Sequence, residues 1–133
     1  MRSFRINTRR REELVDVTDL VAEVAAGAGE ATGIVHVFVP HTTAGVTINE
    51  NADPDVVTDL LAHLANIVPR KVGFRHAEGN SDAHIKASLM GSSVVAPVSK
   101  GKLALGTWQG IYFAEFDGPR SRDLHVTLIT SGN

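Results

Sequence analysis

The chain contains no cysteine. This absence excludes disulfides, cysteine-type zinc fingers, iron–sulfur clusters and catalysis by a thiolate nucleophile. A transition-metal site in this protein must therefore be built from histidine, aspartate and glutamate side chains.

Long apolar runs and an excess of positive charge are also missing. No segment approaches about 18 consecutive apolar residues, the length that suggests a membrane-spanning helix. The first residues, MRSFRINTRRREELV, lack the apolar core of a signal peptide. The 13 Lys and Arg residues face 15 Asp and Glu residues, for a formal net charge of -2, whereas a general nucleic-acid binder is usually basic. We therefore expect a cytoplasmic protein without a membrane or nucleic-acid partner.

Aromatic residues are scarce, at 5% of the chain, but the hydrophobic total of 43% and the charged total of 21% are ordinary for a folded protein. No repeat, low-complexity block or linker-like stretch divides the 133 residues. A chain of this length usually forms one compact domain. We expect a single domain over residues 1–133.

The N-terminal region shows the alternation of apolar and polar residues that is typical of strands. Two strands are expected, at residues 3–8 and 12–17, with Arg9, Arg10 and Arg11 at a hairpin turn between them. The basic run is interpreted as a solvated loop or, alternatively, as an arm that contacts phosphate.

Two helices are expected in the first half of the chain. Thr18 is positioned to cap a helix that ends near Ala26. Asp53 is positioned to cap a second helix, with Pro54 at its first position. The buried stripe of this second helix is expected to consist of Val56, Leu60, Leu64 and Ile67.

Between these helices, residues 33–39 (GIVHVFV) are apolar at nearly every position, which predicts a strand covered on both faces. Pro40 ends this strand, and the polar segment HTTAGVTINEN that follows is expected to be a loop.

The second half of the chain favours one more helix and then a run of strands. The helix is expected over residues 82–90, capped by Ser81 and ended by Gly91. Strands are expected at residues 92–98, 102–106, 108–116 and 123–130. This order predicts an α+β fold, with an antiparallel β-sandwich-like core and about three flanking helices.

Three of the six histidines occupy positions from which side chains can meet in one cleft. His41 follows a strand end, His76 lies in the loop FRHAEGN, and His84 lies in the first turn of a helix. Three neutral imidazoles and an open position describe a zinc site that accepts a ligand. The other three, His36, His63 and His125, are interpreted as packing or surface residues.

Carboxylates cluster near the same points of the sequence. Glu50 and Glu78 are candidates for a general acid or base, or for partners that fix a histidine tautomer. Asp82 is a further candidate, although a carboxylate in a first helical turn is also explained by the helix dipole alone.

An anion site is the next candidate. The segment EGNSD places free backbone N–H groups at a helix N-terminus, and Lys86 follows one turn later. Arg120 and Arg122 come after a DGP turn, from which both can reach the same anion. Lys86 is alternatively a solvated surface residue.

The only tryptophan, Trp108, stands in the segment GTWQG beside Gln109. A bulky ring between glycines is suited to stacking against a ligand that the backbone approaches closely. Ordinary core packing is the alternative.

Three long motifs in order, PHTTAGVTINEN, HAEGNSDAHIKASLMGSS and GTWQGIYFAEFDGPR, closely resemble the YjbQ family of secondary thiamine-phosphate synthases. The resemblance covers nearly the whole chain. It implies a β-sandwich-like fold with flanking helices, a homotrimer, and a site near His41, His76 and His84. Glu50, Glu78, Asn80, Asp82 and Arg120 stand within the matching motifs.

The activity that this resemblance implies joins hydroxymethylpyrimidine diphosphate to a thiazole phosphate and releases pyrophosphate. Such a reaction requires the leaving diphosphate to be neutralised. The metal-bound histidines would act with Arg120 and Lys86 on the diphosphate, and Glu50 or Glu78 would stabilise the cation. Asn80 belongs to the expected substrate-binding set, and Trp108 and Gln109 would hold the pyrimidine.

Two metals fit different parts of this expectation: diphosphate chemistry commonly uses Mg²⁺, whereas three imidazoles favour zinc. Two alternatives therefore stand beside the synthase. One is a metal-dependent hydrolase of a phosphorylated small molecule, and the other is a non-enzymatic module that binds a metal or metabolite.

Overall fold

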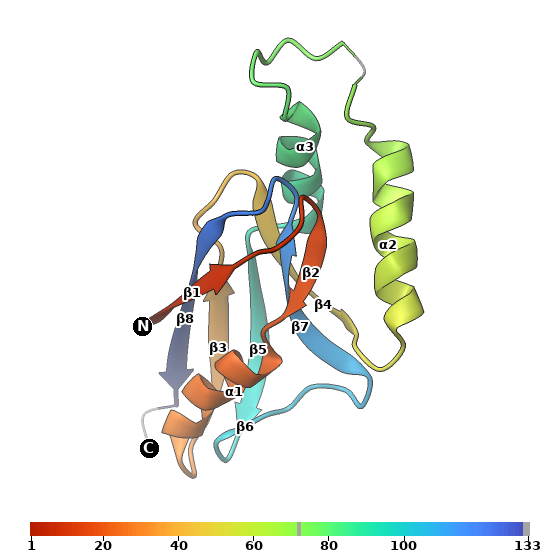
Figure 1. Ribbon diagram of the computed structural model, residues 1–133. Helices are drawn as coiled ribbons and strands as arrows, with labels where there is room; N and C mark the ends of the chain where they lie inside the picture. The colour runs from red at the N-terminus through yellow and green to blue at the C-terminus, as the bar shows by residue number, and fades with distance from the viewer. Residues whose placement is uncertain (72, 132–133) are drawn as a thin grey trace.

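The computed structural model describes residues 1–71 and 73–131 and forms two antiparallel sheets with three α-helices in that part of the chain (Figure 1). The large sheet has the strand order β1-β8-β3-β5-β6, and the small sheet has the order β2-β7-β4. The strands are β1 (Arg2–Asn7), β2 (Glu13–Asp16), β3 (Thr32–Phe38), β4 (Ala44–Glu50), β5 (Ser93–Ser99), β6 (Lys102–Leu103), β7 (Gln109–Glu115) and β8 (Ser121–Thr130). The predicted α+β class is confirmed.

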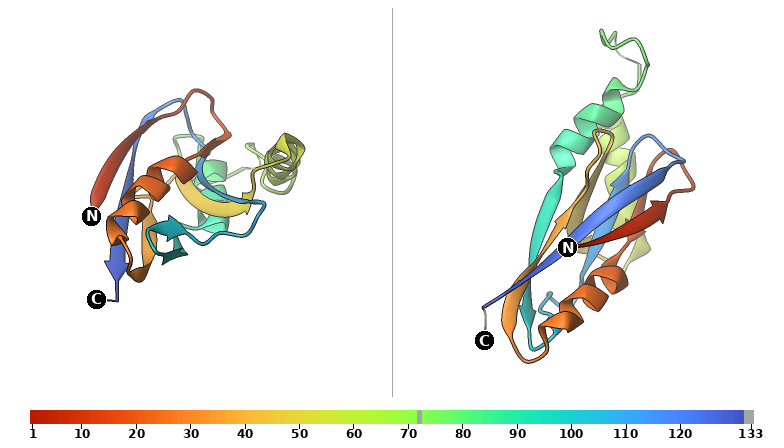
Figure 2. Two further views of the ribbon diagram at one scale, coloured as in Figure 1. Left: turned by 90° about the horizontal axis from the view of Figure 1, so that it is seen from below. Right: turned by 90° about the vertical axis from the view of Figure 1, so that its left-hand side faces the viewer.

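The helices are α1 (Thr18–Ala25), α2 (Pro54–Ile67) and α3 (Ser81–Met90), with a 3-10 turn η1 (Ala26–Ala28) after α1. Helix α1 lies across one end of the two sheets, whereas α2 stands to the side of the small sheet (Figures 1 and 2). In the described part of the chain, no helix is long and apolar enough to cross a membrane.

The small sheet is the middle layer of the molecule, because β7 is buried on both faces. Ile111 and Phe113 belong to the main core, which the inward side chains of both sheets fill. Ala114, near the end of β7, and Phe116, just after it, pack instead against Ala83 of α3. Strand β7 therefore connects the sandwich core to the helix that carries part of the functional site.

The predicted hairpin at Arg9–Arg11 is wrong, because β1 and β2 belong to different sheets. Strand β1 pairs with β8, and β2 pairs with β7. Glu13 stabilises the segment that connects β1 in one sheet to β2 in the other. Its carboxylate accepts the backbone N–H groups of Arg9 and Arg10 at 2.6 and 3.0 Å. Hydrophobic alternation identifies strands but does not reveal their partners.

The predicted caps of the first and third helices are also corrected. Thr18 is the first residue of α1 rather than its cap, and its hydroxyl accepts the backbone N–H of Ile111 at 2.9 Å. Helix α3 is preceded by Asn80, not by Ser81, and the Asn80 side chain bonds to Asp117 instead of capping the helix. For α2 the prediction holds, since Asp53 accepts the N–H of Asp55 at 2.9 Å.

Strand β4 lies within the polar segment that the sequence predicts as a loop. Its alternation is obscured by Gly45, which sequence reasoning associates with turns. A Cβ at Gly45 would lie 2.5 Å from the carbonyl oxygen of Gly91, so this strand requires a glycine where α3 ends against it.

Two predictions of burial are corrected as well. Strand β3 is covered on one face only: Val35 and Val37 are buried, whereas Ile34 and Phe38 are exposed on the other side of the large sheet. No residue of α2 is fully buried, and Ile67 at the end of its apolar stripe is 58% exposed.

Candidate functional site

A pocket of about 420 Å³ lies at the end of the molecule where three chain segments meet. The first segment, residues 40–43, connects β3 to β4. The second surrounds the start of α3 and contributes His76, Glu78, Asn80 and His84. The third connects β7 to β8 and contributes Asp117, Arg120 and, from β8 itself, Arg122. We call this site the histidine pocket.

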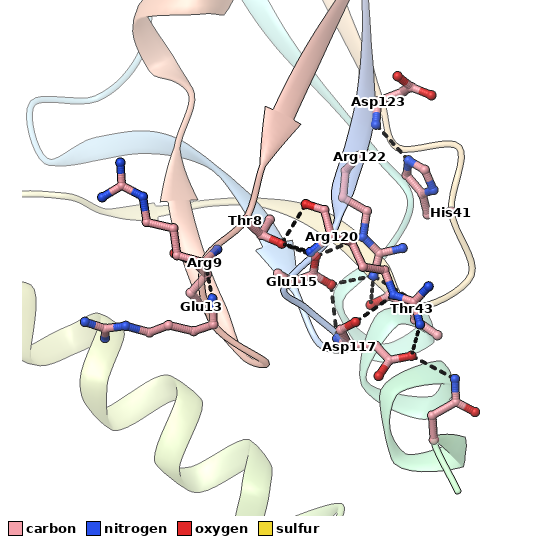
Figure 3. Close-up of polar contacts among 12 residues, drawn as sticks. Thr8, Arg9, Glu13, His41, Thr43, Glu115, Asp117, Arg120, Arg122 and Asp123 are labelled. Carbon is pink, nitrogen blue, oxygen red and sulfur yellow. Dashed lines mark hydrogen bonds and ion pairs between the residues drawn. The ribbon is translucent and has the colours of Figure 1, made fainter. Parts of the chain in front are cut away.

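Arg122 is fixed at the pocket by a buried network that joins the two sheets (Figure 3). Its Nε donates to Glu115 Oε1 at 2.9 Å, and its Nη2 donates to Glu115 Oε2 and to Thr43 Oγ1, the latter at 2.9 Å. The Thr8 hydroxyl also donates to Glu115 Oε1, at 2.7 Å. Within the described residues Nη1 of Arg122 has no hydrogen-bond partner, so this nitrogen is available to a ligand.

Glu115 is ionised in this network. Burial alone would raise the pKa of Glu115, but the hydrogen bonds from Arg122 and Thr8 outweigh it and hold the pKa below its ordinary value. The carboxylate is completely buried and Arg122 is 4% exposed, so neither charge can reorient toward bulk water. The pocket therefore contains a guanidinium whose position is set before any ligand arrives.

His41 is held by its backbone surroundings rather than by a carboxylate. Its Nε2 accepts the backbone N–H of Asp123 at 2.8 Å, as Figure 3 shows. Burial, and next the charge of Arg122, lower the pKa of His41, so the ring is neutral near pH 7. Because Nε2 uses its lone pair on Asp123, the ring proton belongs on Nδ1, which is a donor for an anion.

His76 and His84 form the opposite part of the pocket. Their ring centroids lie 5.3 Å apart with an interplanar angle of 83°. Nε2 of His76 lies 3.8 Å from Glu78 Oε2, close enough for an ion pair when the ring is protonated. Gly79 has φ of +77°, and this turn of the backbone brings the loop residue His76 back toward the first turn of α3.

Asp117 orients the remaining polar side chains of the pocket. Its Oδ2 accepts from Asn80 Nδ2 at 2.8 Å. It also accepts from Arg120 Nη2 at 3.0 Å, and Figure 3 labels Asp117 and Arg120. The Asp117 carbonyl accepts from Arg120 Nε at 2.8 Å. Oδ1 of Asn80 is buried and has no partner within the described residues. A bound donor would satisfy this oxygen.

The three histidines share a pocket but do not form one metal centre. Among residues 1–71 and 73–131, no group of three or more His, Cys, Asp or Glu side chains is arranged to hold a metal ion. The lone pair of His41 Nε2 is occupied, and its Nδ1 carries the proton. The donor set of this chain therefore does not fit a three-histidine zinc site, and His76 and His84 are the pair left for a metal.

Asp82 and Lys86 lie behind the pocket wall and do not line the pocket. Both are almost completely buried. Arg11 donates to both Asp82 oxygens at 3.1 and 3.2 Å, and Lys86 Nζ lies 2.8 Å from Glu12 and 3.2 Å from Asp82. Burial would raise the pKa of Asp82, but Arg11 and Lys86 lower it. These ion pairs attach α3 to the segment between β1 and β2.

Glu50, Trp108 and Gln109 lie at the far ends of the strands that carry the pocket. Glu50 ends β4 and accepts the backbone N–H groups of Ala52 and Asp53 at 3.1 and 3.3 Å. Gln109 begins β7 and accepts from the Gly106 N–H at 2.8 Å, while Trp108 is 62% exposed. Strand β7 separates them from the pocket by roughly 20 Å at the usual rise per residue.

The other three histidines lie elsewhere. His36 and His125 are on the outer face of the large sheet, where each ring stacks with Phe38. His63 of α2 lines a separate apolar hollow with Leu60 and others.

Sequence reasoning missed Thr43, Glu115 and Asp117 as residues of the site. Asp117 was visible only as a turn residue, and Glu115 reads as one polar position inside an apolar strand. The available signal was a strand carrying an acid, followed by a turn and then by Arg120 and Arg122. That spacing allows the acid and one arginine to pair across the two strands.

Comparison with known proteins identifies relatives over nearly the full chain. Residues 2–131 match the family model described as UPF0047 protein YjbQ-like. The chain is 52% identical over 126 residues to UPF0047 protein MJ1081 of Methanocaldococcus jannaschii, covering 95% of this chain and 91% of that protein. It is 45% identical over 130 residues to UPF0047 protein YugU of Bacillus subtilis, covering 97% and 98% of the two chains.

Solved structures agree with the fold. An uncharacterized conserved protein of the yjbq/upf0047 family from Clostridium acetobutylicum is similar with a TM-score of 0.94 and 51% identity, over 97% of this chain and 100% of that chain. A YbjQ-like protein of unknown function from Sulfolobus solfataricus is similar with a TM-score of 0.90 and 35% identity, over 96% and 94% of the two chains.

Proposed function

Because the chain belongs to the UPF0047 family of YjbQ-like proteins, we propose that it is an enzyme that acts on phosphorylated small molecules at the histidine pocket. The specific reaction that we propose is thiamine-phosphate synthesis from hydroxymethylpyrimidine diphosphate and a thiazole phosphate. This reaction comes from the resemblance of the three motifs to secondary thiamine-phosphate synthases.

The observation that carries the proposal is the fixed Arg122. Its Nη1 is free within the described residues, and the rest of the guanidinium is held by Glu115 and Thr43. Arg120 and the Nδ1–H of His41 line the same pocket. Donors that are held in a fixed position stabilise negative charge more than flexible surface groups do. A diphosphate is a suitable ligand for such a set.

A second hollow beside the histidine pocket is suited to an uncharged ring. It has a volume of about 520 Å³ and shares His41, Thr42 and His84 with the histidine pocket. Its other lining residues are small and uncharged: Ala44, Ala87, Ser88, Gly91 and Ser92. We propose that the pyrimidine ring occupies this small-residue hollow while its diphosphate occupies the histidine pocket.

In the proposed reaction, the bond between the pyrimidine methylene carbon and the diphosphate oxygen breaks, and the electron pair leaves with pyrophosphate. The thiazole nitrogen supplies the electron pair of the new carbon–nitrogen bond. Arg122 and Arg120 would neutralise the leaving group, and His41 would donate to it. Glu78, at the rim of the pocket, would stabilise the developing cation. Mg²⁺, when it accompanies the diphosphate, supplies further neutralising charge.

The test is pyrophosphate release from hydroxymethylpyrimidine diphosphate, with and without the thiazole phosphate. We expect release that depends on the thiazole phosphate and that falls about 100-fold or more in His41→Ala, the range for loss of a fixed donor to the leaving group. His63→Ala is the matched control and should retain full activity, because His63 lies on α2 and lines a separate hollow.

Two other results would replace the proposal. Release without the thiazole phosphate would identify a hydrolase. Thermal stabilisation by the substrates without any turnover would identify a binding module.

We propose that zinc, when it binds, is held by His76 and His84. Elemental analysis of the purified protein tests it. Zinc that is lost in His84→Ala but retained in His41→Ala would support a site at the histidine pair. Equal loss in both variants would restore the three-histidine arrangement and contradict the hydrogen bond from Asp123 to His41.

The homotrimer and the cytoplasmic location are also proposed from the resemblance and from sequence. Exposed apolar side chains on the outer face of the large sheet are compatible with contact between copies, namely Ile34, Phe38, Val95 and Ile129. Light scattering on the eluting protein measures the mass in solution. A mass three times that of the 14.2 kDa chain supports the trimer, and a mass equal to one chain excludes it.

A further inference from the structure

A third hollow, of about 390 Å³, adjoins the histidine pocket and shares no lining residue with the small-residue hollow. It is lined by Arg70, Lys71, Gly73 and Phe74 and by the loop residues His76, Glu78 and Gly79. His76 and Glu78 line both this hollow and the histidine pocket, so they form a wall between the two. We call it the basic hollow.

The charge of the basic hollow is net positive, because Arg70 and Lys71 outnumber Glu78, the one carboxylate among its lining residues. Arg70 and Lys71 are exposed and form no ion pair with any residue of 1–71 or 73–131. Most other cations near the site are paired, Arg11 and Lys86 with Asp82 and Arg120 with Asp117. Two adjacent unpaired cations attract an anion, and the phenyl ring of Phe74 offers a surface for a ring beside it.

We propose that the basic hollow is a second subsite that binds the phosphate group of a second, phosphorylated ring compound. The histidine pocket would hold one anion, the basic hollow would hold the other, and His76 and Glu78 would lie between the two ligands. The identity of the second ligand as the thiazole phosphate rests on the function proposed above. The binding of two anions by one chain does not depend on it.

Two anion sites separated by a shared wall are what a transferase with two phosphorylated substrates requires. A hydrolase needs only one such site. Without the basic hollow, the charge of the second substrate would have to be accommodated beside the first in the same pocket, where the two anions repel each other. The arrangement also accounts for Arg70 and Lys71, which nothing in the histidine pocket uses.

Calorimetric titration with inorganic pyrophosphate tests the proposal on the intact chain. We expect two sites per chain in the wild type and one site in the double variant Arg70→Ala, Lys71→Ala, with the lost site at least tenfold weaker. Removing charge-assisted hydrogen bonds to an anion has effects of this size. Arg75→Ala is the matched control, because it removes a neighbouring charge of the same loop that does not line the hollow.

Wild-type protein that binds one pyrophosphate per chain would overturn the proposal. So would a double variant that keeps two sites, or a control that loses as much affinity as the double variant. Circular dichroism and thermal unfolding verify that the double variant is folded, and its exposed side chains make loss of the fold unexpected.

A turnover measurement separates this proposal from the synthase. If the enzyme makes thiamine phosphate, the double variant should raise KM for the thiazole phosphate about tenfold and leave KM for the diphosphate within about twofold, by the same loss of charge-assisted bonds. If two pyrophosphates bind but no synthesis occurs, the synthase proposal fails and the second anion site stands.

Discussion

The two ends of the small sheet carry chemically similar side chains that are held in very different ways. At the pocket end, Glu115 is buried and bonded to the side chain of Arg122, from the large sheet, and to that of Thr8. At the far end, Glu50 and Gln109 accept only from nearby backbone N–H groups. The same segment of sequence, PHTTAGVTINEN, contributes to both ends, because a strand separates its first residues from its last. Closeness within a motif is therefore not closeness in the folded chain.

The largest difference between the two ends should appear in stability. Glu115→Ala leaves the buried Arg122 without its counter-charge, which should lower the free energy of unfolding by about 3–5 kcal/mol. Glu50→Ala removes a partly exposed carboxylate that bonds two backbone N–H groups, and it should cost about 1 kcal/mol. Urea unfolding of both variants measures the contrast. Equal losses would mean that the pocket end is no more firmly held than the far end.

The next largest effect should be a loss of pyrophosphate affinity at Arg120, without a comparable change in the free energy of unfolding. Arg120 has a side chain that is 53% exposed, and its ion pair with Asp117 contributes little to folding. Arg120→Ala should weaken pyrophosphate binding at the histidine pocket by about 1.5–3 kcal/mol while changing the free energy of unfolding by less than about 0.5 kcal/mol. Calorimetry and urea unfolding on the same sample separate the two. A variant that binds normally would remove Arg120 from the anion site.

A smaller change in the free energy of unfolding should appear when the pH is lowered. The pKa values of His41, Glu115 and Asp82 all lie below their ordinary values of 6.5, 4.5 and 3.8. The unfolded chain therefore binds more protons than the folded chain, and the free energy of unfolding falls as the pH falls. The contribution of His41 is complete above about pH 6.5 and decreases below it, and those of the carboxylates decrease at more acidic pH.

Thermal unfolding between pH 7.5 and 3 measures this dependence. His41→Asn should flatten the curve between pH 6.5 and 5 and leave the more acidic part unchanged. The control is His125→Asn, on the outer face of the large sheet. A wild-type curve that rises as the pH falls from 6.5 to 5 would contradict the low pKa of His41.

The smallest effect is expected at the far end. Trp108 is 62% exposed and lies outside the pocket, so Trp108→Ala should change the free energy of unfolding and the affinity for pyrophosphate by no more than about 0.5 kcal/mol. The same assays test it. A large loss of turnover in this variant, with stability intact, would show that the far end of one chain acts in the pocket of another copy.

Sequence reasoning succeeded where structure depends on neighbouring residues. Helix α2 begins at Pro54 behind the Asp53 cap, as its local sequence predicts, and β5 and β8 lie close to the predicted strands. Sequence reasoning failed where residues that are distant in the sequence determine the local structure. The separation of β1 from β2 depends on strand partners elsewhere in the chain, and β4 requires Gly45 because Gly91 approaches it.

In the candidate site, too, features set by neighbouring residues were predicted and features set by distant residues were not. The sequence placed His41, His76 and His84 near strand and helix ends, and all three line one pocket. It did not reveal which nitrogen of His41 is free, because that depends on the backbone N–H of Asp123, 82 residues away. It also did not reveal that Lys86 is buried and forms ion pairs with Asp82 and Glu12, since a helical lysine usually faces solvent.

The bonds of Glu115 link Thr8, which follows β1, to Arg122 of β8 and, through Arg122, to Thr43, which precedes β4. The two sheets are thus joined at the same atoms that present a charge to the pocket. If the sheets separate at this end, the guanidinium loses its alignment in the same event. Amide hydrogens near Arg122 should consequently exchange in the same opening that abolishes anion binding at the histidine pocket.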